Sequence, residues 1–358
     1  MSGTRFSFRE QRRRQRHQRD SERQPEAKLH GVNLGGWLVL ERWLTPSVFA
    51  GTTAEDEYTL MAEPDAAERL RRHRETFITA GDFAWIADQG LDLVRLPVGY
   101  WVLDGDPPFL PAVEVLDRAM DTAAEHGLRV LLDLHAGPGS QNGLDSSARI
   151  GPKLWYRSAA HREHTVRCLA SLVRRYRDHP ALWGIELLNE PIDWRVWRLW
   201  RFHRSALRAL LPLVRPGTRV LFSDGYLPWL LRGSLRSRED VPVVMDCHFY
   251  QCFYPWDVRR RVPDVLVKAA GRRRLIRWLS RAHPVLVGEW SAALDHRTFR
   301  GTDGQDRPAI TARFVEAQLE GYQDALGWCF WTYTSENADD WNFRHLVESG
   351  LLRLRPTD

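Results

Sequence analysis

The sequence predicts an α/β fold, a single (β/α)8 TIM barrel with elaborated loops after its strands. The 358 residues suit one such barrel, which needs roughly 250 residues plus insertions. Short apolar runs alternate with longer amphipathic runs along the chain, which is the pattern of strands that alternate with helices. There are eight apolar runs, a number that favours a closed barrel over an open sheet.

The candidate strands are five to seven residues long and rich in Val, Leu and Ile, as strands buried on both faces should be. In chain order they are Leu29–Asn33, Leu91–Pro97, Leu128–Leu134, Leu182–Leu188, Arg219–Ser223, Val243–Phe249, Val285–Glu289 and Gly327–Trp331.

Amphipathic segments between these strands predict the helices of an outer ring. They are Pro111–His126, His161–Arg177, Trp194–Val214, Asp257–Ala282 and Thr311–Leu326. Stop signals follow them, such as Gly127 after the first and Pro284 after the fourth. The remaining long segments, residues 41–75 and 141–152, are predicted to be loops over the barrel top, where they would shape a cleft.

Residues 28–358 are therefore predicted to be one barrel domain, and residues 1–27 a disordered basic tail. A nucleic-acid or membrane-surface role for this tail is less favoured than a solvated arm, because acidic residues flank the basic run Arg12–Arg16 and no aromatic residue is interleaved in that run. We expect no nucleic-acid partner, and the sequence does not predict the oligomeric state. No signal peptide or long apolar window is present, which favours a cytoplasmic protein without a membrane span.

The four cysteines form no Cys-x-x-Cys pair, and no cluster of His and Cys has the spacing of a zinc site. They are predicted to be small apolar residues in a reducing compartment. We expect no metal and no cofactor.

Polar residues recur where the predicted strands end, and in a TIM barrel those ends form the functional face. Any one of them could be a cap or a satisfied core residue, but a whole set is costly to bury without mutual partners, which indicates one converged site. The set comprises Asn33, Arg95, Asp133, His135, Asn189, Glu190, Asp224, Asp246, His248, Tyr250, Glu289, Trp331 and Tyr333.

Glu190 and Glu289 end two different strands, and two carboxylates on one rim are what retaining glycoside hydrolysis needs, about 5 Å apart. The proton donor needs a raised pKa, while the attacking carboxylate must stay ionised. Arg95, His248 and Tyr250 are candidates to hold the ionised one. By strand alternation Glu186 lies on the face of Glu190 but roughly 13 Å deeper, which favours a structural role. Asn189 could bind a sugar hydroxyl, and Trp331 could lie beneath the sugar ring.

These residues occur in an ordered series of motifs that resembles glycoside hydrolase family 5, and most closely its exo-β-1,3-glucanases. The resemblance extends over most of the chain from about Gly31. The motifs are Gly31–Glu41 followed by Thr45–Ser47, Val94–Trp101, Asp133–His135, Pro138–Gly143, Glu186–Pro191, His248–Gln251 and Gly288–Ser291.

The resemblance implies a retaining hydrolase of terminal β-glucosidic bonds, in which Glu190 is the acid/base and Glu289 the nucleophile. It also implies a sugar site lined by Glu41, Arg95, His135, Asn189, His248, Tyr250, Phe253 and Trp331. The family clamps the next sugar between two phenylalanines. Phe253 matches one of them, but Leu144 stands where the other is expected.

Because Leu144 departs from the family pattern and no export signal is found, the sequence does not identify the group that is attached to the terminal glucose. One alternative is a β-glucosidase that acts inside the cell on a glucosylated lipid, sterol or small metabolite. Another is a non-catalytic carbohydrate-binding barrel, which the presence of both glutamates disfavours.

Overall fold

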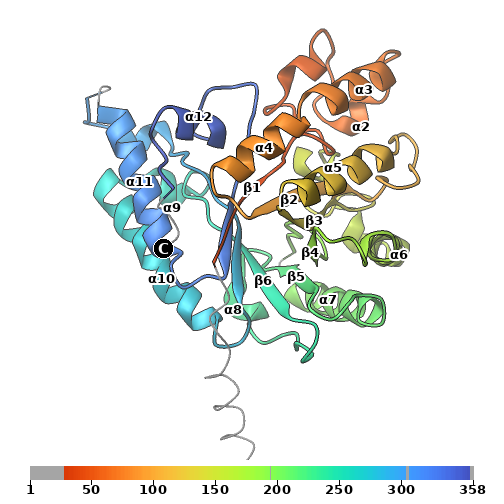
Figure 1. Ribbon diagram of the computed structural model, residues 1–358. Coiled ribbons are helices and arrows are strands. Elements are labelled where there is room, and N and C mark those ends of the chain that lie inside the picture. The colour runs from red at the N-terminus through yellow and green to blue at the C-terminus, as the bar shows by residue number, and fades with distance from the viewer. Residues whose placement is uncertain (1–27, 194, 304–305, 355–358) are drawn as a thin grey trace, which may run out of the picture.

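The computed structural model describes residues 28–193, 195–303 and 306–354, and the basic tail expected at residues 1–27 lies outside these ranges. Eight parallel strands form a closed barrel in which each strand pairs with the next in the chain, and β8 pairs with β1 (Figure 1). The strands are β1 (Leu29–Asn33), β2 (Leu93–Gly99), β3 (Arg129–Ala136), β4 (Leu182–Glu186), β5 (Arg219–Ser223), β6 (Val243–His248), β7 (Val285–Glu289) and β8 (Gly327–Phe330). The predicted fold class is confirmed.

Helices surround the strands, as Figure 1 shows. The longer ones are α3 (Ala66–Thr76), α4 (Ala80–Asp88), α5 (Val113–Glu125), α6 (Ala159–Tyr176), α7 (Val196–Leu210), α10 (Val262–Leu279) and α11 (Arg307–Gly321). Shorter ones are α2 (Glu57–Leu60), α8 (Pro228–Leu231), α9 (Pro255–Val258) and α12 (Phe343–Glu348). None of these helices has the length and apolar character needed to cross a membrane.

The segments between strands differ from the sequence prediction in two places. Residues 41–75, predicted to be an elaborated loop over the barrel top, contain α2 and most of α3. The Asp56 side chain caps α2 and accepts a hydrogen bond from the Thr59 backbone N–H. The helix expected over residues 257–282 is two helices, since α9 ends at Val258 and α10 restarts with Pro263 in its first turn.

The barrel is filled in layers from its amino-terminal end. One buried apolar residue from each strand forms the floor: Leu29, Leu93, Leu131, Trp183, Leu221, Val244, Leu286 and Cys329. Two residues further along β2 and β3, on the same inward face, lie Arg95 and Asp133, both fully buried. The layer above the apolar floor is therefore polar, and it supports the face on which the strands end.

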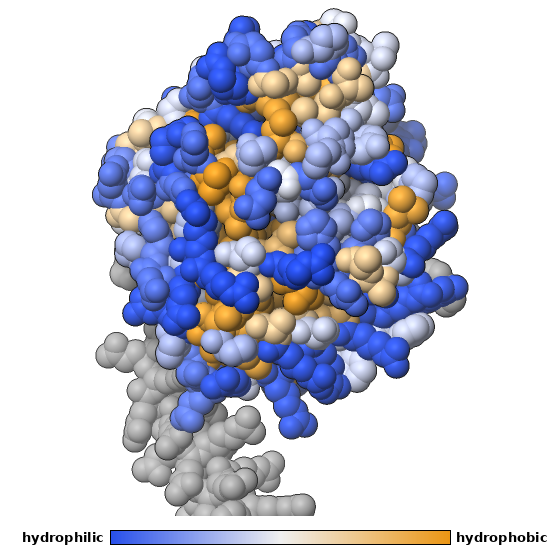
Figure 2. Space-filling model, turned by 90° about the vertical axis from the view of Figure 1, so that its right-hand side faces the viewer, coloured by the Kyte–Doolittle hydropathy of each residue, from blue (hydrophilic) through white to orange (hydrophobic). Residues whose placement is uncertain are grey.

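A larger apolar layer lies between the outside of the barrel and its helices. It holds the strands in register, which fixes the positions of the polar residues at their carboxyl ends. The face of the molecule in Figure 2 is largely hydrophilic, with hydrophobic residues showing in patches between the charged ones.

Candidate active site

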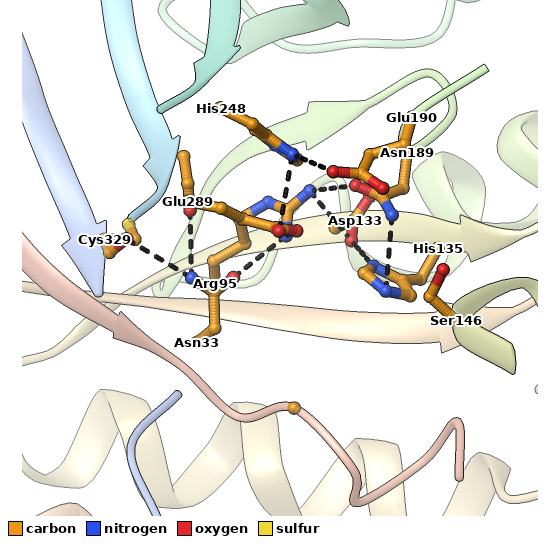
Figure 3. Close-up of polar contacts among 12 residues, drawn as sticks. Asn33, Arg95, Asp133, His135, Ser146, Asn189, Glu190, His248, Glu289 and Cys329 are labelled. Carbon is orange, nitrogen blue, oxygen red and sulfur yellow. Dashed lines mark hydrogen bonds and ion pairs between the residues drawn. The ribbon is translucent and has the colours of Figure 1, made fainter. Parts of the chain in front are cut away.

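Glu190 and Glu289 face each other at the carboxyl ends of β4 and β7 (Figure 3). One carboxylate oxygen of each, together with a ring nitrogen of His248, lie within 4.8 Å of one another. The two oxygens are thus closer than the carboxyl groups of inverting pairs, which stand about 6.5–9.5 Å apart, and this suits direct attack on a sugar by one carboxylate.

The backbone around Glu190 is held in an unusual conformation. Glu190 has a φ of +41°, a region in which residues other than glycine are rarely found. The preceding residue is anchored on both sides: the Asn189 N–H donates to the Leu134 carbonyl at 3.0 Å, and Gln141 Nε2 donates to the Asn189 carbonyl at 2.9 Å. Such strain costs about 1–3 kcal/mol and is retained where it positions a functional group.

Arg95 connects the site to the polar layer of the barrel. It is fully buried and donates to Glu289 Oε1 at 2.8 Å and to Asn189 Oδ1 at 2.9 Å. Beneath them it also donates to Glu186 Oε2, at 3.0 Å from Nε. Glu186 is thus a structural partner, as predicted, and one guanidinium orients the carboxylate and the amide beside it.

Glu289 receives a second hydrogen bond from Tyr250 Oη at 2.8 Å. The residue before it, Gly288, donates its N–H to Asp246 Oδ1 at 2.7 Å. A Cβ at Gly288 would come within 2.2 Å of that carboxylate, so only glycine fits there. The position of Glu289 thus depends on a close contact between the β7 backbone and a side chain of β6.

His248 lies between the two glutamates. Its Nδ1 is 2.8 Å from Glu190 Oε1 and 3.3 Å from Glu289 Oε2, and its Nε2 is 3.3 Å from Asp246 Oδ2. Glu190 also accepts a hydrogen bond from Tyr226 Oη. His248 was a candidate to hold the ionised glutamate, and it contacts both glutamates, with Glu190 the nearer.

Burial and charge set the protonation of this group. Burial alone would lower the pKa of His248, but the carboxylates of Glu289 and Asp246 raise it well above its usual value. Burial also raises the pKa of Glu289. The pKa of Glu190 is lowered, because hydrogen bonds from His248 and Tyr226 outweigh its burial. The raised pKa expected of the proton donor is therefore not found on Glu190, whereas the pKa of His248, whose Nδ1 lies 2.8 Å from Glu190 Oε1, is raised.

A pocket lined by aromatic rings and a buried carboxyl lies beside these groups. The rings of His135 and Trp331 stack 5.2 Å apart at an interplanar angle of 7°. The Glu41 carboxyl is buried there and accepts a hydrogen bond from Trp43 Nε1 at 2.9 Å, and its Oε1 has no hydrogen-bond partner among the described residues. Burial and the nearby Asp145 raise the pKa of Glu41 well above its usual value.

The site opens into a cavity of about 1310 Å³. The cavity is lined by both catalytic candidates and by every residue of the implied sugar site except Arg95, which contacts Glu289 from below: Glu41, His135, Asn189, His248, Tyr250, Phe253 and Trp331. Leu144 also lines the cavity.

The structure corrects the set of strand-end residues in two respects. Tyr333 does not join the site, because its hydroxyl donates to Asp82 Oδ1 at 2.8 Å and its ring packs against Trp85. Tyr226 and Asp145 were not predicted but line the cavity. Tyr226 comes from a turn after β5, with φ +60°, where no motif marks it.

Two groups of side chains in the described part of the chain are close enough to hold a metal ion: Glu186, Asp246 and His248, and Glu190, His248 and Glu289. Both groups share His248. Its two ring nitrogens already contact carboxylates, so a metal would have to replace those contacts.

Comparison with known proteins agrees with this geometry. The family model described as Cellulase (glycosyl hydrolase family 5) matches residues 69–337. The chain is 36% identical to "Probable glucan 1,3-beta-glucosidase A" of Emericella nidulans, with 92% of this chain and 91% of that protein covered. It is 34% identical to "Glucan 1,3-beta-glucosidase" of Blumeria graminis, with 91% and 86% covered.

Solved structures share the fold at lower identity. The rutinosidase from Aspergillus niger superposes with a TM-score of 0.78 at 20% identity, covering 90% of this chain and 97% of that one. The endoglucanase Cel5A from Thermotoga maritima gives a TM-score of 0.57 at 16% identity, covering 90% and 96%.

Proposed function

The chain belongs to glycosyl hydrolase family 5, and on that basis we propose that it is a retaining β-glucosidase of the exo-β-1,3-glucanase type. The observation that carries the proposal is the pair of buried glutamates with oxygens within 4.8 Å, each held by its own tyrosine. The substrate is a carbohydrate or glucoside with a terminal β-linked glucose.

In the first step the Glu289 carboxylate attacks the anomeric carbon, and Glu190 donates a proton to the glycosidic oxygen. The C–O bond to the leaving group breaks, and an alcohol departs. Because His248 Nδ1 lies 2.8 Å from Glu190 Oε1, protonated His248 can pass its proton to Glu190 when substrate binds.

In the second step Glu190 takes a proton from water, and the resulting hydroxide attacks the anomeric carbon. The bond to Glu289 breaks and glucose leaves with its β configuration retained. Arg95 and Tyr250 both donate to Glu289, so they stabilise its charge before attack and after release.

The buried polar pocket is the proposed glucose site. Glu41 Oε1 has no hydrogen-bond partner among the described residues, although His135 Nε2 lies 3.9 Å away, and it can accept a hydrogen bond from a sugar hydroxyl. His135 and Asn189 border the same space, and Trp331 offers a flat apolar surface that suits the C–H face of a pyranose ring.

Hydrolysis of an aryl β-glucoside and of laminari-oligosaccharides tests the proposal, with Glu289→Gln as the matched variant. We expect turnover by the wild-type protein and its loss in Glu289→Gln. A Glu289→Gln protein as active as the wild type would show that Glu289 is not the nucleophile. A wild-type protein that hydrolyses neither substrate class would contradict the proposed function.

We also propose that the enzyme works in a reducing compartment. The four cysteines are free thiols, and Cys247 and Cys329 among them are buried in the barrel. Fractionation of the producing cells followed by immunodetection tests this, and recovery of the protein outside the cells would contradict it.

A further inference from the structure

We propose that the leaving-group side of this site binds an extended aromatic aglycone, so that the preferred substrates are aryl β-glucosides with more than one ring. This inference rests on the proposed function and names the substrate class of the same site.

The leaving group must begin beside Glu190, because Glu190 protonates the glycosidic oxygen. A row of aromatic rings starts at that carboxylate. Tyr226 donates its hydroxyl to Glu190 Oε1, and its ring meets Tyr254 edge-on at 6.4 Å. Tyr254 then stacks on Trp256 at 4.7 Å and 7°. We call Tyr226, Tyr254 and Trp256 the Tyr254 wall.

A second aromatic row starts at the other carboxylate. Tyr250 donates to Glu289, and its ring lies 5.2 Å from Phe253 and 5.5 Å from Trp341. Phe253 and Trp341 stack at 5.8 Å. We call Tyr250, Phe253 and Trp341 the Trp341 wall. Both walls line the same cavity, so the part of a bound ligand that extends out of the glucose site lies beside flat apolar surfaces.

The outer residues of this cavity are large, apolar and open to solvent. Trp256 is 61% exposed, Phe253 62%, Trp229 56% and Leu144 48%, although all four line the cavity. Apolar side chains gathered at the mouth of a cavity are a feature of binding surfaces rather than of ordinary solvent-facing positions. An apolar ligand that covers them would remove their surface from water.

Some polar groups in the outer part of the cavity contact other side chains, whereas Asp193 Oδ2, Asp257 Oδ2 and Arg272 Nε have no hydrogen-bond partner among the described residues. Lys268 and Arg260 both contact the Asp257 carboxylate, and the Arg272 guanidinium lies 4.4 Å over the Phe249 ring. A second glucose would bring several hydroxyls that each need a partner, at a cost of about 1–3 kcal/mol for each one buried without it. Flat aromatic rings need no such partners.

The cavity is also larger than one sugar requires. Its volume of about 1310 Å³ exceeds the range of about 300–1,000 Å³ that is typical of pockets for drug-sized ligands. Glucose fills the polar end near Glu41, which leaves the space between the two walls for an aglycone. The chemistry is that of the proposed function, in which the C–O bond breaks and the phenolic oxygen takes the proton from Glu190.

Phenyl and 2-naphthyl β-glucosides provide the test, because phenol and 2-naphthol have similar acidity and differ mainly in ring area. We expect the wild-type kcat/KM to be about tenfold higher for the naphthyl than for the phenyl glucoside, as a stacked aromatic contact of about 1.4 kcal/mol gives. We expect Trp256→Ala to bring the ratio close to one.

Trp197→Ala is the matched control, since Trp197 is 54% exposed on α7 and does not line this cavity. Binding of 2-naphthyl β-glucoside to Glu289→Gln, followed by tryptophan fluorescence, separates affinity from turnover, and Trp256→Ala in that background should weaken it about tenfold.

A naphthyl-to-phenyl ratio near one in the wild type, or an equal loss on all substrates in Trp256→Ala, would overturn the inference while leaving the glycosidase activity in place. Failure of the wild-type protein to hydrolyse any β-glucoside would instead overturn the proposed function, and the inference with it.

Discussion

Removal of the Tyr250 hydroxyl tests how the protein holds Glu289 ionised. Tyr250→Phe keeps the ring that packs against Phe253 and Trp341 and deletes only the 2.8 Å hydrogen bond to Glu289 Oε2. A hydrogen bond to a charged group contributes about 1.5–3 kcal/mol, and one pKa unit corresponds to about 1.4 kcal/mol. The pKa of Glu289 should therefore rise by about 1–2 units in the variant.

The acidic limb of the pH profile reports the ionisation of Glu289. Hydrolysis needs Glu289 deprotonated, so a raised pKa moves the acidic limb of the kcat/KM profile to higher pH by about 1–2 units. The assay is kcat/KM for an aryl β-glucoside between pH 4 and 9. Tyr333→Phe is the control, because it deletes a tyrosine hydroxyl that donates to Asp82, away from the site.

Tyr333→Phe should leave the acidic limb where it is in the wild type. An acidic limb that is unchanged or lower in Tyr250→Phe would refute the assignment of Tyr250 as the donor that stabilises ionised Glu289.

Three further predictions concern catalysis and stability. Glu190→Gln should lower kcat by about 10²–10⁴ on alkyl glucosides and much less on aryl glucosides with acidic phenols, and an equal loss on both would argue against Glu190 as proton donor. Burial raises the pKa of Glu57 to about 7, so its contribution to stability falls as pH rises from 4.5 through 7. The free energy of unfolding of Glu57→Gln minus that of the wild type, measured with denaturant, should therefore be about 2–3 kcal/mol larger at pH 8 than at pH 5. A difference that does not change with pH would contradict this. Burial lowers the pKa of His203 to about 3, so stability is lost as pH falls below 6.5. The free energy of unfolding of His203→Phe minus that of the wild type should be about 2 kcal/mol larger at pH 5 than at pH 8. A thermal unfolding midpoint equal to that of the wild type at both pH values would contradict this.

The barrel could be predicted from the sequence because its strands are buried on both faces and read as continuous apolar runs. Leu29–Asn33, Arg219–Ser223 and Val285–Glu289 were predicted at the observed bounds. The helices were less certain, because α9 and α10 form one amphipathic pattern and the interruption at residues 259–261 leaves no strong signal other than Pro263.

The site could be predicted as far as residues lie on strand ends, where the alternation of side chains fixes their direction. Tyr333 shows the limit, because the chain turns after β8 and carries this side chain toward Asp82. Tyr226 lies in a turn with positive φ, and its contact with Glu190 depends on tertiary structure that no local pattern encodes. The pKa order of the two glutamates likewise depends on which of them lies nearer to His248.

Covalent trapping of the sugar tests the central claim most directly. A 2-deoxy-2-fluoro-β-glucoside with a dinitrophenyl leaving group forms the glycosyl-enzyme but hydrolyses slowly, so the intermediate can be digested and located by mass spectrometry. We predict one fluoroglucosyl group on the peptide that carries Glu289, and none on it in Glu289→Gln. Labelling of Glu190, or release of α-glucose with no labelled peptide, would contradict the double displacement assigned to this pair.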